Sequence, residues 1–390
     1  MAKYSSNFWL LCFSSFLFFT SVTMVLAEMP DYLKSLGGED YLGLIIALAT
    51  LSAGISRPFS GKLTDRWGRI PVMIFGSTVG MAVCFLYPAL ASVFGFLTLR
   101  FMHGFATGFK PTGTAAYVAD IISADRRGEA MGIVSFFGTT GMALGPSIGS
   151  LIFLEFDITT LFYVSGVSSI LSVIILSGMK ETLVEKEKFS WQMLKVGRDE
   201  IFEPTVLPAS VVMLLSMVAF GTLLTLSPDF SKYLGIENKG LFFSFYTGSS
   251  MLSRIVGGKV SDKIGRVAVL RVSMIIIFLS MIFIGYAQNP TWLFLGAVIY
   301  GIGNGLTNPT LFAWAIDLCP DQFRGRGVAT LYIFLEIGIG SGSFFSGWAY
   351  QQDPSRFPLI FAVSGFFSLL GFVYLWWSNS KRQQVIFNRQ

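Results

Sequence analysis

The stretch Ser56–Arg69, SRPFSGKLTDRWGR, occurs a second time as Ser253–Arg266, SRIVGGKVSDKIGR. A shift of 197 residues (253 minus 56) brings the two copies into register, and it also aligns other pairs along the chain. These pairs are Asp120 with Asp317, Arg127 with Arg324, Gly128 with Gly325, Gly104 with Gly301, and Gly108 with Gly305. The chain is therefore predicted to consist of two related halves that fold alike.

Composition places most of the chain in a lipid bilayer. Of its 390 residues, 53% are hydrophobic and 13% are charged, and the mean hydropathy is +0.64. Apolar runs of roughly 20 residues, the length that crosses a hydrocarbon core as a helix, follow one another along the sequence. We predict helices at 6–28, 41–60, 70–90, 94–118, 129–152, 158–178, 205–228, 240–257, 267–287, 292–316, 327–350 and 356–378. The predicted fold is an all-α polytopic membrane protein with twelve transmembrane helices in two pseudo-symmetric six-helix bundles.

A charged stretch from Lys180 to Glu203 separates the two predicted bundles. We therefore predict an N-terminal bundle at 1–179, a cytoplasmic linker at 180–203, a C-terminal bundle at 204–380 and a cytoplasmic tail at 381–390. The net charge of +5 reflects topology, because most of the 28 Lys and Arg residues fall in loops on one side of the predicted helices. The positive-inside rule places both termini in the cytoplasm, and nucleic-acid binding is not expected.

The sequence lacks the groups that an integral membrane enzyme needs. It has one histidine, no phosphate-binding G-x-x-x-x-G-K-[ST] segment and no paired acidic motif with ligand spacing. Cys12, Cys84 and Cys319 stand in or beside separate predicted helices, which favours packing over a zinc site or a disulfide. We expect no enzymatic activity, no cofactor and no metal site, and an ion gradient as the energy source.

The repeated stretch forms a charged connection between two predicted helices on the cytoplasmic side. Its glycines allow a tight reversal, and its acidic residue can pair with nearby basic groups. The segment from Gly61 resembles the G-x-L-x-D-x-x-G-R loop of the major facilitator superfamily, and the resemblance covers essentially the whole chain. It implies a conformational latch that holds the cytoplasmic side closed; alternatively, the charges only anchor the loop. The latch residues would be Gly61, Asp65, Arg66, Gly68 and Arg69, with Asp262 and Arg266 in the second copy.

The fourth predicted helix carries Arg100, His103 and Lys110 on one face. Its segment from Arg100 to Gly108 is similar to the superfamily's R-x-x-Q-G-x-x-x-G motif, with His103 where glutamine is usual. Ionisable groups at the bilayer centre cost roughly 2.5–3.5 kcal/mol each, so they normally face a cavity or a partner. We expect these three residues to take part in substrate binding or proton coupling; the alternatives are a silent ion pair for Lys110 and a packing role for His103.

The fifth predicted helix has small residues at four-residue spacing, namely Gly141, Gly145 and Gly149, and a proline at Pro146. Such spacing lets another helix approach closely, and the proline weakens the helical ladder. The segment resembles the G-x-x-x-G-P-x-x-G-G motif of the superfamily's proton-coupled exporters, except that Ser150 replaces the last glycine. The resemblance therefore favours export, although packing alone would also explain the motif.

Five further polar positions are candidates for coupling or binding. Glu336 lies near the middle of the eleventh predicted helix, and a carboxylate whose proton affinity depends on conformation can couple proton flow to transport. Glu28 and Asp31 lie at the outer end of the first helix. Asn304 and Asn308 stand one turn apart in the tenth and can bind a ligand or satisfy backbone near a proline.

These features together predict a secondary transporter that works by alternating access. The favoured mode is proton-coupled export of a small organic compound, either an anion such as a metabolite or siderophore, or a drug; the alternative is a proton symporter or facilitator that imports a metabolite. The expected partners are the substrate, protons and the lipid bilayer, and the chain is expected to act as a monomer. We expect a multi-pass location in a bacterial cytoplasmic membrane.

Overall fold

The computed structural model describes residues 4–123, 126–183, 186–195, 197, 202–320 and 324–387. Within this range, the side chains of 127–129, 255–259, 262, 324–325 and 378–387 are not described, so the predicted latch residue Asp262 lies outside the described side chains. The described residues form helices and no strands. By the contacts between its residues, the chain divides into two compact units.

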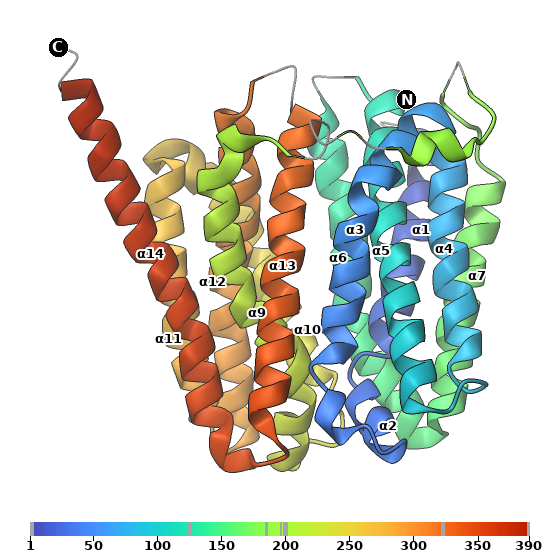
Figure 1. The fold of residues 1–390 in the computed structure, drawn as a ribbon, viewed down its shortest axis with the longest axis vertical. Coiled ribbons are helices and arrows are strands. Elements are labelled where there is room, and N and C mark those ends of the chain that lie inside the picture. Colours follow the sequence, from blue (N-terminus) through green and yellow to red (C-terminus); the bar gives the residue numbers. More distant parts are fainter. Residues whose placement is uncertain are drawn as a thin grey trace. The chain divides into compact units, whose positions relative to one another are not determined.

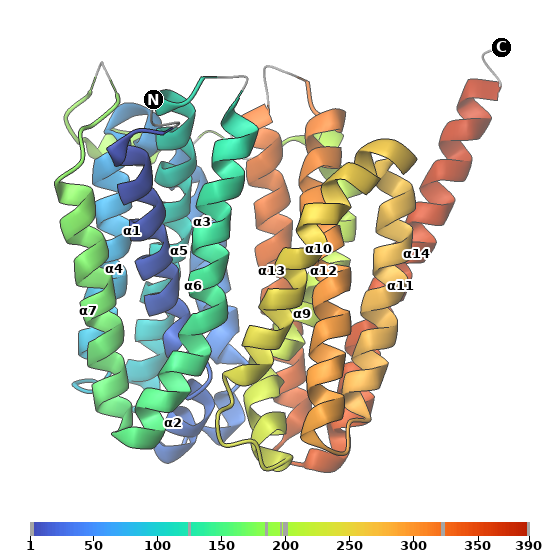
Figure 2. The same cartoon turned by 180° about the vertical axis from the view of Figure 1, so that it is seen from behind.

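Unit 1 comprises Met1–Ile201 and Glu237–Ser244. Its helices, in blue to green in Figures 1 and 2, run alternately up and down, with the short α2 at one end. The elements are α1 (Ser6–Met24), α2 (Met29–Ser35), η1 (Glu39–Tyr41), α3 (Leu44–Arg66), α4 (Arg69–Leu86), α5 (Val93–Ile121), α6 (Arg127–Glu155), α7 (Ile158–Ser177) and η3 (Trp191–Leu194).

Unit 2 comprises Phe202–Ile236 and Phe245–Gln390. The elements are η4 (Pro204–Val206), α9 (Leu207–Tyr233), α10 (Leu241–Ile264), α11 (Arg266–Gly285), α12 (Pro290–Leu318), α13 (Arg324–Tyr350), η6 (Pro354–Arg356) and α14 (Phe357–Phe387). The first residues of α10 therefore belong to unit 1. Both units use the same helix pairs: α1 packs on α6 and α7, as α9 packs on α13 and α14.

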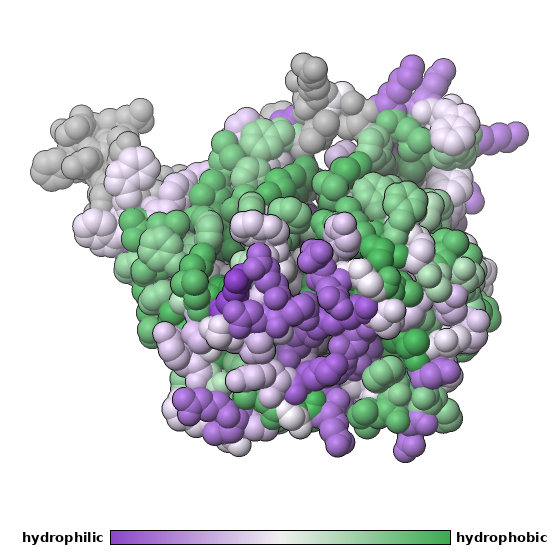
Figure 3. Space-filling model, turned by 60° about the horizontal axis from the view of Figure 1, so that its bottom comes forward, coloured by the Kyte–Doolittle hydropathy of each residue, from purple (hydrophilic) through white to green (hydrophobic). Residues whose placement is uncertain are grey.

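The predicted all-α membrane fold is confirmed. Twelve helices of at least 18 residues occur in the described residues, and each overlaps one predicted span. Nine of the described helices are long and apolar enough to cross a membrane, and α5, α10 and α12 are not among these nine. Figure 3 shows hydrophilic side chains gathered on the end of the molecule where α2 lies and hydrophobic side chains around them.

The connection between α3 and α4 is shorter than expected. The helix continues through Arg66, so Gly61 lies inside α3 with open space beside its α-carbon, and it makes no turn. Gly68 makes the reversal, with a φ of 134° that favours glycine. Gly265 repeats this geometry before α11, with a φ of 93°. The prediction that Gly61 takes part in the turn was therefore wrong. Gly68 makes the turn in the first half, and Gly265 makes it in the second.

Glycines set the close helix contacts in both units. A side chain at Gly104 of α5 would meet the carbonyl of Ala49 in α3, and one at Gly301 of α12 would meet the carbonyl of Tyr246 in α10. The shift of 197 residues relates Ala49 to Tyr246 as well, so the two halves repeat the same contact. Backbones that approach this closely bury little apolar area and rely on van der Waals packing, which is the main attraction between helices in lipid.

The predicted small-residue motif of α6 packs along α1. Gly141, Gly145 and Gly149 face the main chain of α1 at successive turns, at Phe16, Thr20 and Met24. The helix runs without interruption through Pro146. The motif therefore makes a continuous helix contact.

We expect Gly149→Ala to destabilise the protein by about 1–3 kcal/mol, because the added methyl would overlap the carbonyl of Met24. Gly132→Ala, on the same helix with open space around it, serves as the control and should be neutral or stabilising by up to about 1 kcal/mol. Thermal unfolding of both variants in detergent measures the difference. Similar midpoints for the two would contradict the packing of α6 on α1.

Candidate functional site

Lys110 is buried inside unit 1, with 1% of its surface exposed. Its ammonium donates to the carbonyl oxygen of Ser14 at 2.7 Å, to Ser14 Oγ at 2.9 Å and to Ser172 Oγ at 2.6 Å. The ring of Phe18 lies 4.6 Å from Nζ. An ammonium has three N–H donors, so this cage of acceptors from α1 and α7 matches the protonated form. Among the described residues, no carboxylate pairs with Lys110, which removes the silent ion pair as an explanation there.

Arg100 and His103 lie together one turn apart on α5, and both are buried. Arg100 donates from Nε to the carbonyl oxygen of Ile45 at 2.7 Å. Its Nη1 lies 3.4 Å from Tyr87 Oη and 3.4 Å from His103 Nδ1. The Nε2 atom of His103 has no hydrogen-bond partner in the described part of the chain. The predicted basic face of α5 is therefore turned into the helix packing of unit 1, where tyrosine and serine hydroxyls surround it.

A second buried charge cluster lies at the outer end of α1. Lys239 donates to Glu28 at 2.5 Å and to Asp31 at 2.7 Å, although about 210 residues separate them in sequence. Ser150 of α6 donates to the other oxygen of Glu28 at 2.6 Å and accepts from the amide of Gly240. The serine that departs from the exporter motif is thus a ligand of the buried carboxylate. We call these residues (Glu28, Asp31, Ser150 and Lys239) the outer cluster.

Electrostatics in the outer cluster favour a charged lysine. Burial lowers the pKa of Lys239, but the adjacent carboxylates of Glu28 and Asp31 outweigh burial and raise the pKa above its usual 10.5. The side chain of Glu28 is 1% exposed, whereas that of Asp31 is 23% exposed. Asp31 is therefore the more accessible carboxylate of the cluster.

The opposite ends of the helices carry the predicted latch residues. Arg69 pairs with Asp120 at 2.9 Å and with Asp65 at 3.5 Å, and Arg66 lies 4.0 Å from Glu187 of the linker. In unit 2, Arg266 pairs with Asp317 at 3.1 Å and donates to Ser261 at 2.8 Å. Asp120 and Asp317 are thus equivalent partners of the two arginines. The alignment of the two halves had paired these aspartates without assigning them a role.

In unit 2, aromatic and amide groups gather around Tyr246. Tyr246 Oη donates to Asn304 Oδ1 at 3.3 Å, and Asn308 Nδ2 donates to the same oxygen at 3.1 Å. The rings of Tyr246 and Tyr300 lie 5.6 Å apart. In the described part, Asn304 Nδ2 and Asn308 Oδ1 have no partner, so both amides keep capacity to bind another polar group. Glu336 lies near the middle of α13 and is partly exposed.

Comparison with known proteins agrees with this architecture. A family model described as Major Facilitator Superfamily matches residues 11–245 and 209–389. The chain belongs to the Major Facilitator Superfamily. It is a membrane transporter and not an enzyme, as the sequence predicted.

Two relatives of this superfamily member are named for multidrug resistance or multidrug efflux. It is 28% identical to the multidrug resistance protein MdtG of Serratia proteamaculans, over 96% of this chain and 93% of that protein. It is 29% identical to the multi-drug resistance efflux pump PmrA of Streptococcus pneumoniae, over 95% and 97% of the two chains. Among solved structures, the peptide transporter POT has a TM-score of 0.79 at 14% identity and covers 98% of this chain and 96% of its own; this likeness shows the fold alone.

Several residues of the candidate site were not predicted from the sequence. Lys239 was counted only as an outer-loop charge, because its partner Glu28 lies in the other half. Tyr87 and the tyrosine pair of unit 2 look like ordinary aromatic residues of apolar spans. The sequence did hold one signal for the cluster at the end of α1. At a shift of 198 residues, Asp31 aligns with Asp229, which is buried in α9.

We expect Ser172→Ala to destabilise the protein by about 1–3 kcal/mol, because one N–H of the buried Lys110 ammonium would lose its acceptor. Ser168→Ala is the matched control on the same helix, since its hydroxyl is exposed and donates only to the carbonyl of Val164. Thermal unfolding in detergent compares them. An equal effect of the two substitutions would show that the cage does not hold the ammonium.

Lys239→Met should destabilise the protein by about 3–5 kcal/mol, because it leaves a buried carboxylate without its cation. Lys186→Met, at an exposed linker position, should have little effect. A raised lysine pKa in the folded state adds stability that is complete below pH 10.5 and is lost as pH rises through the raised value. Unfolding curves between pH 7 and 11 should therefore converge for wild type and Lys239→Met only in alkali; a constant gap would contradict the pairing.

Proposed function

We propose that this transporter exports a small organic compound from the cytoplasm in exchange for protons. The outer cluster is the observation that carries the coupling. Two carboxylates hold one lysine there, and protonation of either carboxylate removes part of its attraction for Lys239. A proton from the outer side would therefore loosen the attachment of the segment that leads into α10, whereas loss of the proton would restore it.

The α6 motif supports this direction of transport. It packs along α1 beside the outer cluster. Its last position, Ser150, donates to Glu28, so the export-type motif and the titratable group are in direct contact. The named efflux relatives span nearly the whole length of the chain and favour the same direction. A symporter in the same fold remains the alternative that the transport experiment separates.

The tyrosine and asparagine cluster of unit 2 favours a planar, partly apolar substrate. The rings of Tyr246 and Tyr300 lie beside the amides of Asn304 and Asn308, which have an unused donor and an unused acceptor among the described residues. By contrast, Arg100 and Lys110 already have acceptors within unit 1, so they give less support to an anionic substrate. We therefore propose an aromatic drug-like compound as substrate.

The test is proton movement in proteoliposomes that contain a pH-sensitive dye, with ethidium as the aromatic cation and benzoate as an aromatic anion. We expect ethidium to move against the proton flow, and Glu28→Gln to abolish coupled proton movement because an amide cannot release a proton. Glu39→Gln, which alters an exposed acid on the same side, should couple like wild type. Glu336→Gln tests the carboxylate of Glu336 as an alternative proton site in unit 2.

Proton and substrate fluxes in the same direction would replace antiport by symport. Normal coupling in Glu28→Gln with loss in Glu336→Gln would move the proton site to unit 2. Substrate transport without any proton signal would reject proton coupling altogether. Transport of benzoate in preference to ethidium would overturn the proposed substrate class but not the coupling.

A further inference from the structure

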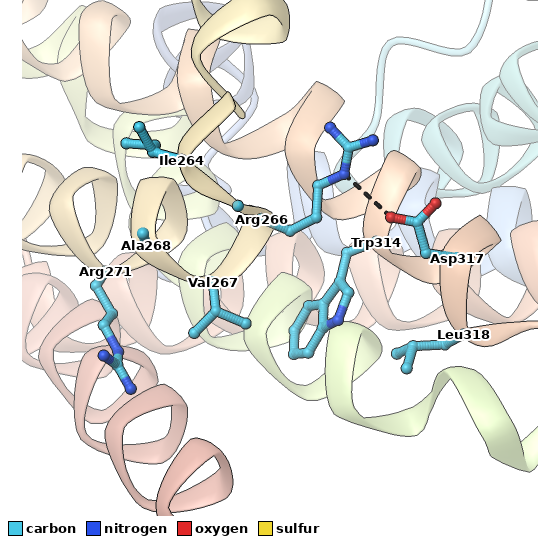
Figure 4. A pocket seen from close by; sticks show the side chains of 9 residues that line it. Ile264, Arg266, Val267, Ala268, Arg271, Trp314, Asp317 and Leu318 are labelled. Carbon is cyan, nitrogen blue, oxygen red and sulfur yellow. Dashed lines mark hydrogen bonds and ion pairs between the residues drawn. The ribbon is translucent and has the colours of Figure 1, made fainter. Parts of the chain in front are cut away.

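A pocket of about 410 Å³ lies in unit 2 where α11 begins. Figure 4 shows Arg266 reaching toward Asp317 on one side, Arg271 on the other and the indole of Trp314 between them. The remaining lining residues are Ile264, Gly265, Val267, Ala268 and Leu318. Two guanidinium groups and one carboxylate give the lining a net positive charge.

The first turn of α11 adds a second positive feature. The first N–H groups of a helix have no carbonyl partner within it, and the helix dipole makes this end favourable for anions. Among the described residues, no side chain caps α11 and no acidic residue stands in its first turn. The helix has 20 residues, so its amino-terminal field is fully developed.

The first half of the chain shows what this turn can bind. There the equivalent helix is α4, and its first amides are bonded by the carboxylate of Glu181: Arg69 N donates to Oε1 at 3.2 Å, and Ile70 N donates to Oε2 at 3.0 Å. Arg69 and Ile70 align with Arg266 and Val267 under the shift of 197 residues. The same helix start thus already acts as an anion site in unit 1.

Among the side chains that the structure describes, the second half shows no counterpart of this internal carboxylate. The residue aligned with Glu181 is Ser378, which has a hydroxyl group. In addition, α7 ends at Ser177 and the chain then turns back over α4, whereas α14 continues as a helix to Phe387. In the first half, the chain after the sixth helix therefore caps α4. In the second half, the chain at this point runs past α11.

Arg271 provides a donor for the same pocket. Its Nη2 donates to the carbonyl oxygen of Leu375 in α14 at 2.9 Å, which fixes the guanidinium beside the pocket. Its Nε is buried and has no hydrogen-bond partner in the described residues. The guanidinium thus has one N–H group whose position an incoming anion could satisfy.

We propose that this pocket binds a phosphate group, through the first-turn amides of α11, Arg271 and Arg266. The source favoured by the surroundings is the headgroup of an anionic phospholipid. Large apolar side chains are exposed beside the pocket, namely Ile264, Val272, Trp376 and Trp377, which suits acyl chains and the interfacial region. The positive-inside rule places this end in the cytoplasm, where basic pockets between helices bind anionic headgroups. The inference is independent of the substrate and of proton coupling.

The experiment is calorimetric titration of the purified full-length protein in neutral detergent with three probes: dihexanoyl phosphatidylglycerol, dihexanoyl phosphatidylcholine and inorganic phosphate. We expect tightest binding of phosphatidylglycerol, and about tenfold weaker binding in Arg271→Gln, as for loss of one charge-assisted contact. Lys263→Gln is the matched control, because it removes one exposed positive charge close by without touching the pocket, and it should change affinity less than twofold.

A second variant guards against misfolding of the first. Ala268→Glu places a carboxylate in the first turn of α11, where acids are favourable, so folding should be retained while phosphate binding is lost. Unchanged affinity in both Arg271→Gln and Ala268→Glu would overturn the proposal. Binding of inorganic phosphate as tight as that of phosphatidylglycerol, and lost in Ala268→Glu, would support the site and assign it to a soluble phosphate instead of a lipid.

Discussion

Polar groups inside a bilayer must find their hydrogen-bond partners within the protein, because lipid offers none. This constraint explains the composition of the buried helix faces. Serines of α1 and α7 meet in pairs, such as Ser14 with Ser172 at 2.9 Å and Ser21 with Ser169 at 2.9 Å. Elsewhere in unit 1, glycines of α5 and α6 allow close approach to α3, α4 and α1. The cage around Lys110 is built from one of these serine pairs, Ser14 and Ser172.

The same constraint separates what the sequence could predict from what it could not. Helix positions followed from runs of apolar residues, and the repeated turns followed from identical residues at one shift, since both signals are local in sequence. The partners of Lys110 are hydroxyls on two other helices, and nothing in the sequence of α5 tells which faces of α1 and α7 meet it. Glu28 was predicted as a candidate, but its pairing with Lys239 was missed, because that contact depends on how a loop late in the sequence folds within unit 1.

The charged connections at the helix ends show a second limit. Asp65 was expected to pair with nearby basic groups, and it lies 3.5 Å from Arg69, but the shorter distance from that guanidinium is to Asp120, at 2.9 Å. The latter residue is 51 positions away and was recognised only as a member of an aligned pair. An alignment of the repeats identifies equivalent positions in the two halves. The contacts that these positions make are seen only when the helices are packed.

Differences between the halves are as informative as their likeness. The turn glycines and their arginine–aspartate pairs are the same in each unit, so both halves fix this helix connection in the same way. On the equivalent helices α5 and α12 the residues diverge: the positions of Arg100, His103 and Lys110 correspond to Ala297, Tyr300 and Thr307. At these positions α5 therefore carries basic groups where α12 carries none. Because Arg100 and Lys110 are held by fixed acceptors within unit 1, these positions of α5 have little freedom to rearrange, whereas the uncharged side chains of α12 need no such partners.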